Sequence, residues 1–85
     1  MALVILRAPL SELAGGRRHP VAGDTVAEAL AALERACPQL RGWVLDEQGR
    51  SRRHVNVYVN GQLAQDGTTL APDDRVHVLP AITGG

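Results

Sequence analysis

The sequence predicts an α+β protein in which one main helix packs on one face of a mixed β-sheet. Three features support this prediction: an unbroken apolar run near the start, one amphipathic segment, and two alternating apolar segments in the second half. Apolar residues at three- and four-residue spacing are typical of a helix, whereas strict alternation is typical of a half-buried strand. The chain has 85 residues, a length that fits a single domain.

The first two strands are predicted to form a hairpin with a loop. Residues 2–6 are a continuous apolar run rich in β-formers, which favours a strand covered at least partly on both faces, as at the centre of a sheet. Gly15-Gly16 is a turn signal, and the polar segment at residues 17–21 follows as the second strand.

The main helix has a clear start and a clear end. Thr25 can cap it, and Glu28 three residues later completes a capping box. One apolar stripe then follows at helical spacing: Val26, Ala29, Leu30, Leu33 and Cys37. Pro38 ends the helix because proline loses a backbone hydrogen bond and clashes with the preceding turn. Three apolar residues beyond it are expected to cover one end of the core: Leu40, Trp43 and Val44.

The second half predicts three more strands after a polar loop at residues 46–51. Residues 54–60 alternate cleanly, with the valines at 55, 57 and 59 toward the core. Asn60-Gly61 has a strong hairpin preference and leads to a short strand at residues 62–64. A turn at residues 72–74 precedes the last strand, at residues 75–79, whose inward side chains are Val76 and Val78.

This element order is the pattern of a β-grasp fold, in which the first and last strands lie parallel at the sheet centre. We expect the domain to span residues 1–80. Residues 81–85 carry too little apolar surface to pack firmly, so they are expected to form a flexible tail that ends in Gly84-Gly85.

One helix covers only one face of the sheet, so the other face is expected to stay open. Alternation from the core valines places Tyr58, His77 and Leu79 on that open face. Val4 or Leu6 are candidates to join them, because an all-apolar strand does not reveal which of its side chains point which way. Large exposed apolar groups suggest a docking patch, although scattered ones are also ordinary on protein surfaces.

Composition excludes several classes of function. The formal net charge is zero, with nine basic and nine acidic side chains, whereas a nucleic-acid-binding protein would show a basic excess. The run at residues 2–6 is too short for a signal peptide, and no stretch approaches the roughly 20 apolar residues that span a bilayer. A single cysteine fits a reducing compartment, so we expect a cytoplasmic protein with no nucleic acid or membrane partner.

Three other groups of residues are candidate sites. Cys37 is interpreted as a core residue rather than a reactive thiol, because the helix C-terminus disfavours a thiolate. The histidines His19, His54 and His77 fall on three predicted strands without further ligands at suitable spacing, so no metal site is expected. A basic cluster at residues 50–53 is interpreted as a solvated loop, with contact to an acidic partner or phosphorylated substrate as the alternative.

Three segments together resemble the ThiS/MoaD family of ubiquitin-like sulfur carriers. They are V-N-V-Y-V-N-G at residues 55–61, P-D-D-R-V-H-V-L-P at residues 72–80, and the terminal Gly84-Gly85. Within that family the chain is most similar to CysO-type carriers of cysteine biosynthesis. The molybdopterin synthase small subunit also ends in two glycines, but typically has aromatic residues where this chain has Val78-Leu79.

The resemblance implies that Gly85 is the reactive residue. A free carboxylate is ionised at neutral pH, with a pKa of about 3.3–3.7, and is a poor electrophile. In the family an E1-like enzyme of the MoeB/ThiF type uses ATP to adenylate it, and a sulfur donor then converts it to a thiocarboxylate. Two glycines suit this chemistry because they can thread a narrow channel, and Pro80 stiffens the exit from the sheet.

The resemblance further implies a protein co-substrate, not an enzyme, with no cofactor bound to the chain itself. Expected partners are the E1-like enzyme, a sulfur-accepting synthase and a metalloprotease that releases the product. The acceptor in a CysO-type pathway is an activated serine derivative. Six residues are predicted to contact partners: Tyr58, Leu79, Pro80, Ala81, Ile82 and Thr83.

Alternatives stay open at this point. They are the small subunit of molybdopterin synthase, a carrier for thiamine or a specialised metabolite, and a ubiquitin-like interaction or conjugation module.

Overall fold

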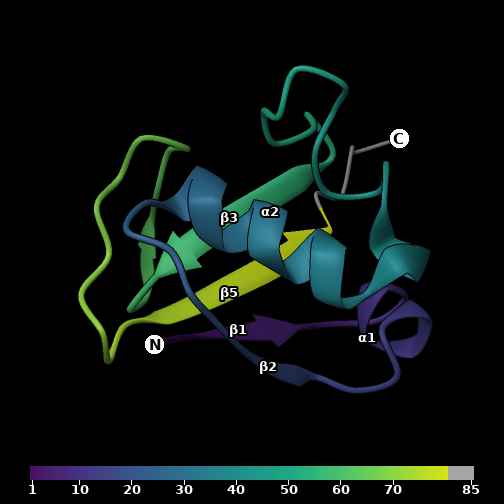
Figure 1. The fold of residues 1–85 in the computed structure, drawn as a ribbon, viewed down its shortest axis with the longest axis horizontal. Coiled ribbons are helices and arrows are strands. Elements are labelled where there is room, and N and C mark those ends of the chain that lie inside the picture. Colours follow the sequence, from purple (N-terminus) through teal and green to yellow (C-terminus); the bar gives the residue numbers. More distant parts are fainter. Residues whose placement is uncertain (81–85) are drawn as a thin grey trace.

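Helix α2 lies across one face of a five-stranded mixed sheet in the computed structural model, which describes residues 1–80 (Figure 1). The strand order is β2-β1-β5-β3-β4, and β1 and β5 run parallel while every other pair is antiparallel. This confirms the predicted α+β class, the β-grasp order and the parallel pairing of the first and last strands. The elements are β1 (Ala2–Leu6), α1 (Leu10–Leu13), β2 (Arg18–Val21), α2 (Val26–Ala36), η1 (Pro38–Leu40), β3 (Val55–Val59), β4 (Gln62–Leu63) and β5 (Arg75–Pro80).

Strand β1 alternates between the two faces of the sheet. Val4 and Leu6 are fully buried toward α2, whereas Leu3 and Ile5 are half-buried on the other side. The candidacy of Val4 and Leu6 for the open face was therefore wrong. The register with β5 explains why, because Val4 pairs with Val76 and Leu6 pairs with Val78, and both valines are in the core.

The start of α2 is fixed by hydrogen bonds close to those predicted. Thr25 Oγ1 accepts from the backbone N–H of Glu28 at 3.2 Å, which confirms the cap. Glu28 Oε1 accepts from the N–H of Asp24 at 2.8 Å, one residue earlier than a standard capping box. The first two amides of the helix donate to the carbonyls of Thr68 and Asp66. The helix start is therefore anchored to the loop before β5.

Gly23 sets how closely the chain approaches the helix. A Cβ at this position would lie 2.6 Å from the backbone nitrogen of Ala29, a separation that backbone atoms do not allow. Only glycine fits here.

The loop after α2 departs from the prediction in one side chain. Leu40 and Val44 are fully buried as expected, but Trp43 is 47% exposed and does not cover the core. The carboxylate of Glu34 accepts hydrogen bonds from the amides of Val44 and Leu45. These bonds turn both residues inward and leave the tryptophan outside.

Smaller differences lie at element ends. The expected loop after β1 contains the short helix α1, whose Leu10 is buried. Strand β2 begins at residue 18, and β5 continues through Pro80, which pairs with Val55.

No helix within residues 1–80 has the length and apolar content needed to cross a bilayer.

Candidate functional site on the open face of the sheet

The sheet face turned away from α2, here called the open face, carries one continuous cross-strand row. Ile5 pairs with His77, His77 pairs with Tyr58, and Tyr58 pairs with Leu63. Directly paired residues share a face of the sheet and lie close enough to touch. The row therefore joins β1, β5, β3 and β4 into one band that is largely apolar.

Tyr58, His77 and Leu79 lie on the open face, as the sequence predicted, but they are half-buried rather than fully exposed. They line a shallow hollow of about 210 Å³ together with Arg7 and Gly61. An aromatic ring and a guanidinium group therefore border this hollow.

The turn beside this hollow is a tight hairpin connection. Asn60 and Gly61 have φ of 51° and 87°, the left-handed values that a two-residue turn of this kind requires. The side chain of Asn60 accepts from the backbone N–H of Arg75 at 3.0 Å and donates to Asp74 at 2.8 Å. These bonds fasten the hairpin to the start of β5.

Sequence reasoning missed half of the open face. Leu3, Ile5 and Arg7 lie there because β1 alternates, and Arg18 and Arg75 are their neighbours on β2 and β5. The polar second strand held a usable signal. Val21 is the one core residue of β2, so Arg18, three positions earlier, points to the opposite face. Arg18 pairs with Ile5, and this pairing shows that Ile5 faces the open side of the sheet.

Strand β5 directly precedes the C-terminal segment of the chain. Pro80, a predicted partner-contact residue, is the last residue of β5 and is exposed. The other predicted tail residues, Ala81, Ile82, Thr83, Gly84 and Gly85, lie outside the described residues.

Cys37 is buried at the end of α2, as predicted, with 8% of its surface exposed. Its Sγ lies 3.7 Å from Nδ1 of His19, whose Nε2 lies 2.9 Å from the carbonyl oxygen of Gly16. His54 lies in the turn before β3 rather than in a strand. Within residues 1–80, no three His, Cys, Asp or Glu side chains gather to hold a metal ion.

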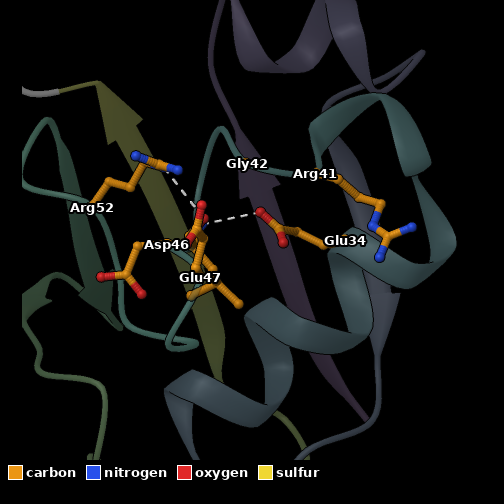
Figure 2. A pocket seen from close by; sticks show the side chains of 7 residues that line it. Glu34, Arg41, Gly42, Asp46, Glu47 and Arg52 are labelled. Carbon is orange, nitrogen blue, oxygen red and sulfur yellow. Dashed lines mark hydrogen bonds between the residues drawn. The ribbon is translucent and has the colours of Figure 1, made fainter.

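A second hollow, of about 270 Å³, lies between α2 and the loop that follows it. Figure 2 shows Glu34 and Arg52 reaching toward the loop from opposite sides. Glu34 accepts from the amide of Leu45 at 3.0 Å, and Arg52 Nε donates to the carbonyl of Leu45 at 3.3 Å. Arg52 is thus half-buried and holds the loop, so only its neighbours in the basic cluster, Arg50 and Arg53, are exposed.

Comparison with known proteins identifies the family. The ThiS family profile matches residues 4–85. Small archaeal modifier protein 1 of Haloferax volcanii is 41% identical over 83 residues, which cover 94% of this chain and 95% of that protein. A crystal structure of that protein aligns with a TM-score of 0.84 at 39% identity, covering 99% of this chain and 98% of that one.

A second solved relative is CysO of Mycobacterium tuberculosis. It aligns with a TM-score of 0.83 at 27% identity, over 96% of this chain and 100% of that one. The profile match spans almost the entire sequence, and these relatives share the ubiquitin-like sheet and helix described above. The chain belongs to the ThiS family of small ubiquitin-like carrier and modifier proteins.

Proposed function

We propose that this chain is a sulfur carrier whose reactive group is the C-terminal carboxylate of Gly85. The observation that carries the proposal is the ThiS family match, which continues through Gly84 to Gly85. The chain acts as a protein co-substrate, and its partners supply the catalytic groups. The reaction belongs in the cytoplasm, where ATP is available to the activating enzyme.

Activation takes two balanced steps. A carboxylate oxygen of Gly85 first attacks the α-phosphorus of ATP on an E1-like enzyme of the MoeB/ThiF type, and pyrophosphate leaves. A sulfur nucleophile then attacks the acyl carbon of the adenylate, AMP leaves, and a thiocarboxylate remains. Adenylation is needed because the free carboxylate is ionised at neutral pH and resists nucleophilic attack. Glycine at both last positions lets the end of the chain enter a narrow active site.

The open face supplies the body that partners recognise. Tyr58 and Leu79 are half-buried there beside a hollow, and Pro80 continues the same strand toward the reactive end. Ala81, Ile82 and Thr83 connect that strand to the glycines and enter the partner's channel. The same surface serves the activating enzyme and, in turn, the sulfur-accepting synthase.

The sulfur acceptor we propose is an activated serine derivative, which would give cysteine. The similarity to CysO at 27% identity supports this assignment. The thiocarboxylate sulfur would replace the leaving group on Cβ of the serine derivative and form a thioester. The amino group of the new amino acid would then attack the thioester carbonyl, which moves the acyl group from sulfur to nitrogen, and a metalloprotease would hydrolyse the resulting peptide bond to release cysteine.

Intact-mass spectrometry tests the proposal directly. The chain is incubated with the E1-like enzyme of its host, ATP and sulfide, and a deletion variant without Gly85 serves as the control. We expect the full chain to exchange one oxygen for one sulfur at Gly85, and the deletion variant to keep its mass. An unchanged full chain beside an active enzyme would refute the carrier function.

Protein conjugation is a second candidate, favoured by the 41% identity to a protein named as a modifier. In that reaction a lysine amine displaces AMP and forms an isopeptide bond. All nine basic residues of this chain are arginine, so the lysine would have to belong to another protein. Adducts of higher mass with Gly85 joined to a lysine would establish this function. A thiocarboxylate without such adducts would support the carrier function and contradict conjugation.

A further inference from the structure

Two arginines flank the end of β5, the place where the C-terminal segment begins. Strands β1 and β5 run parallel and end side by side, and β3 begins at the same end of the sheet (Figure 1). Arg7 follows the last residue of β1 and lines a hollow with Leu79. Arg53 lies two residues before Val55, which pairs with Pro80. Both arginines are exposed, and together with Leu79 and Pro80 they are here called the exit rim.

The exit rim lies within the length of the segment that follows it. Five residues come after Pro80, and five residues span at most about 17 Å. Neighbouring strands are only about 4.8 Å apart, so an acyl group on Gly85 can reach either arginine of the rim. Arg75 begins β5 at the other end of the sheet, about 17 Å from Pro80 at the rise of a strand. Only a reversed and fully extended segment would reach it.

The chemical nature of the basic side chains matters at this place, because an activated acyl group reacts with accessible amines. A lysine amine has a pKa of about 10.4, so a fraction of it is neutral and can attack an acyl carbon. The arginine guanidinium stays protonated and has no free electron pair to attack with. All nine basic residues of the chain are arginine. The exit rim therefore carries positive charge without a nucleophilic amine.

The thiol of the chain is also kept away from the acyl group. Cys37 is buried, with 8% of its surface exposed, at the end of α2. His54 is exposed in the turn that follows Arg53, but an acyl-imidazole is short-lived because water hydrolyses it. An amine or a thiol would hold the acyl group as a lasting product, and neither is among the side chains of the exit rim.

We infer that the arginines of the exit rim determine the chemical selectivity of the activated end. They supply charge beside Gly85 while leaving its acyl group to an external sulfur nucleophile. The inference rests on the proposed function, because it requires an activated Gly85. A lysine at the same place would compete: its amine would attack the acyl carbon, the leaving group would depart, the nitrogen would lose a proton, and an isopeptide bond would close the chain on itself.

The test uses a C-terminal thioester of the full chain, prepared by intein cleavage with a small thiol and kept at mildly alkaline pH. Intact-mass spectrometry follows its fate. The wild-type thioester is expected only to hydrolyse. Arg7→Lys and Arg53→Lys are expected to give a second product, one water lighter than the hydrolysed chain, in which peptide mapping finds Gly85 joined to the substituted position.

Two control variants make the test specific. Arg75→Lys places the same amine at the far end of β5, and we expect about tenfold less cyclised product, because effective concentration collapses when a linker barely spans two sites. Arg53→Gln removes the charge without adding an amine and should hydrolyse like wild type. Thermal unfolding of each variant verifies that it is folded.

The outcomes separate this inference from the carrier function. Hydrolysis alone in both folded rim variants, or equal cyclisation in Arg75→Lys, would overturn the role of the exit rim. The thioester experiment needs no activating enzyme, so this result would leave the carrier function standing. The carrier function fails separately, if the wild-type chain keeps its mass beside an active E1-like enzyme, ATP and sulfide.

Discussion

The two faces of the sheet are made from alternate residues of the same strands, yet they differ in nearly every property. On the covered face Val4, Leu6 and Val78 are completely buried under α2. On the open face their neighbours Ile5 and Leu79 are only half-buried, and arginines lie around them. Among residues 1–80 no polar or charged residue is buried. Stability thus comes mainly from one side of the sheet, and the recognition proposed above uses the other.

The free energy gained by burying apolar side chains explains why the covered face dominates stability. Fully burying a valine or leucine side chain contributes roughly 1.5–3 kcal/mol, and the covered face does this many times over. Half-exposed side chains contribute only part of that amount. Substitutions on the open face should therefore cost little stability, whereas substitutions on the covered face should cost much more.

The largest effect is expected from adjacent residues of β1 that face opposite ways. Leu6→Ala should lower the free energy of unfolding by about 2–5 kcal/mol, because it removes a fully buried side chain and leaves a cavity. Ile5→Ala, its half-buried neighbour, should cost about 1 kcal/mol. Urea denaturation of both variants measures the difference. Equal losses would contradict the division between the faces.

A smaller loss is expected at the glycine that lets the chain approach the helix. Gly23→Ala would push a methyl group against the backbone of Ala29 and should cost about 1–3 kcal/mol. Gly67→Ala is the matched control, because a Cβ there meets nothing within 4 Å. If both variants unfold at the same urea concentration, α2 is not held as closely as described.

The helix cap should contribute less again. Thr25→Ala removes the acceptor of the Glu28 amide and should cost about 1 kcal/mol. Thr25→Ser keeps a hydroxyl at the same place and should retain most of the stability. A serine variant as unstable as the alanine variant would mean that the methyl group, not the hydrogen bond, matters at this position.

Local patterns were enough to predict the covered face. The capped apolar stripe of α2 and the alternating valines of β3 and β5 define its core directly, because each pattern has one possible inward side. The Asn60-Gly61 turn was also predictable, since few dipeptides accept positive φ at both positions.

The open face was harder because its residues are set by pairing rather than by local pattern. Strand β1 is apolar at every position, so only its register with Arg18 and Val76 shows which side chains are inside. The exposure of Trp43 likewise depends on Glu34, ten residues before the amide of Val44 that it holds. Neither relationship can be read from a short window of sequence.

Acid should weaken the turn at residues 71–74, which precedes β5 and is held by the carboxylate of Asp74. A hydrogen bond from the backbone N–H of Ala71, and a second from the Asn60 side chain, hold the pKa of Asp74 below its ordinary value of 3.8. A carboxyl with a lowered folded-state pKa stabilises the fold above its unfolded pKa, and that contribution is lost as pH falls through the folded pKa.

Asp74→Asn removes this contribution. The variant should be less stable than wild type at neutral pH, and the two unfolding midpoints should converge below about pH 4. Urea denaturation across this range measures both curves. A gap that stays constant down to low pH would show that ionisation of Asp74 is not what stabilises the turn.

The smallest effect on stability is expected at Leu63, and it is the most informative for function. This side chain ends the apolar band and is 69% exposed, so Leu63→Ser should change the free energy of unfolding by less than about 0.5 kcal/mol. If the band is the centre of a docking surface, the same variant should raise KM for adenylation about threefold to tenfold. Its neighbour Gln62 is also exposed but points to the other side of the two-residue strand. Gln62→Ser should therefore leave both stability and KM unchanged, and a KM that moved equally in the two variants would remove the open face as the site of recognition.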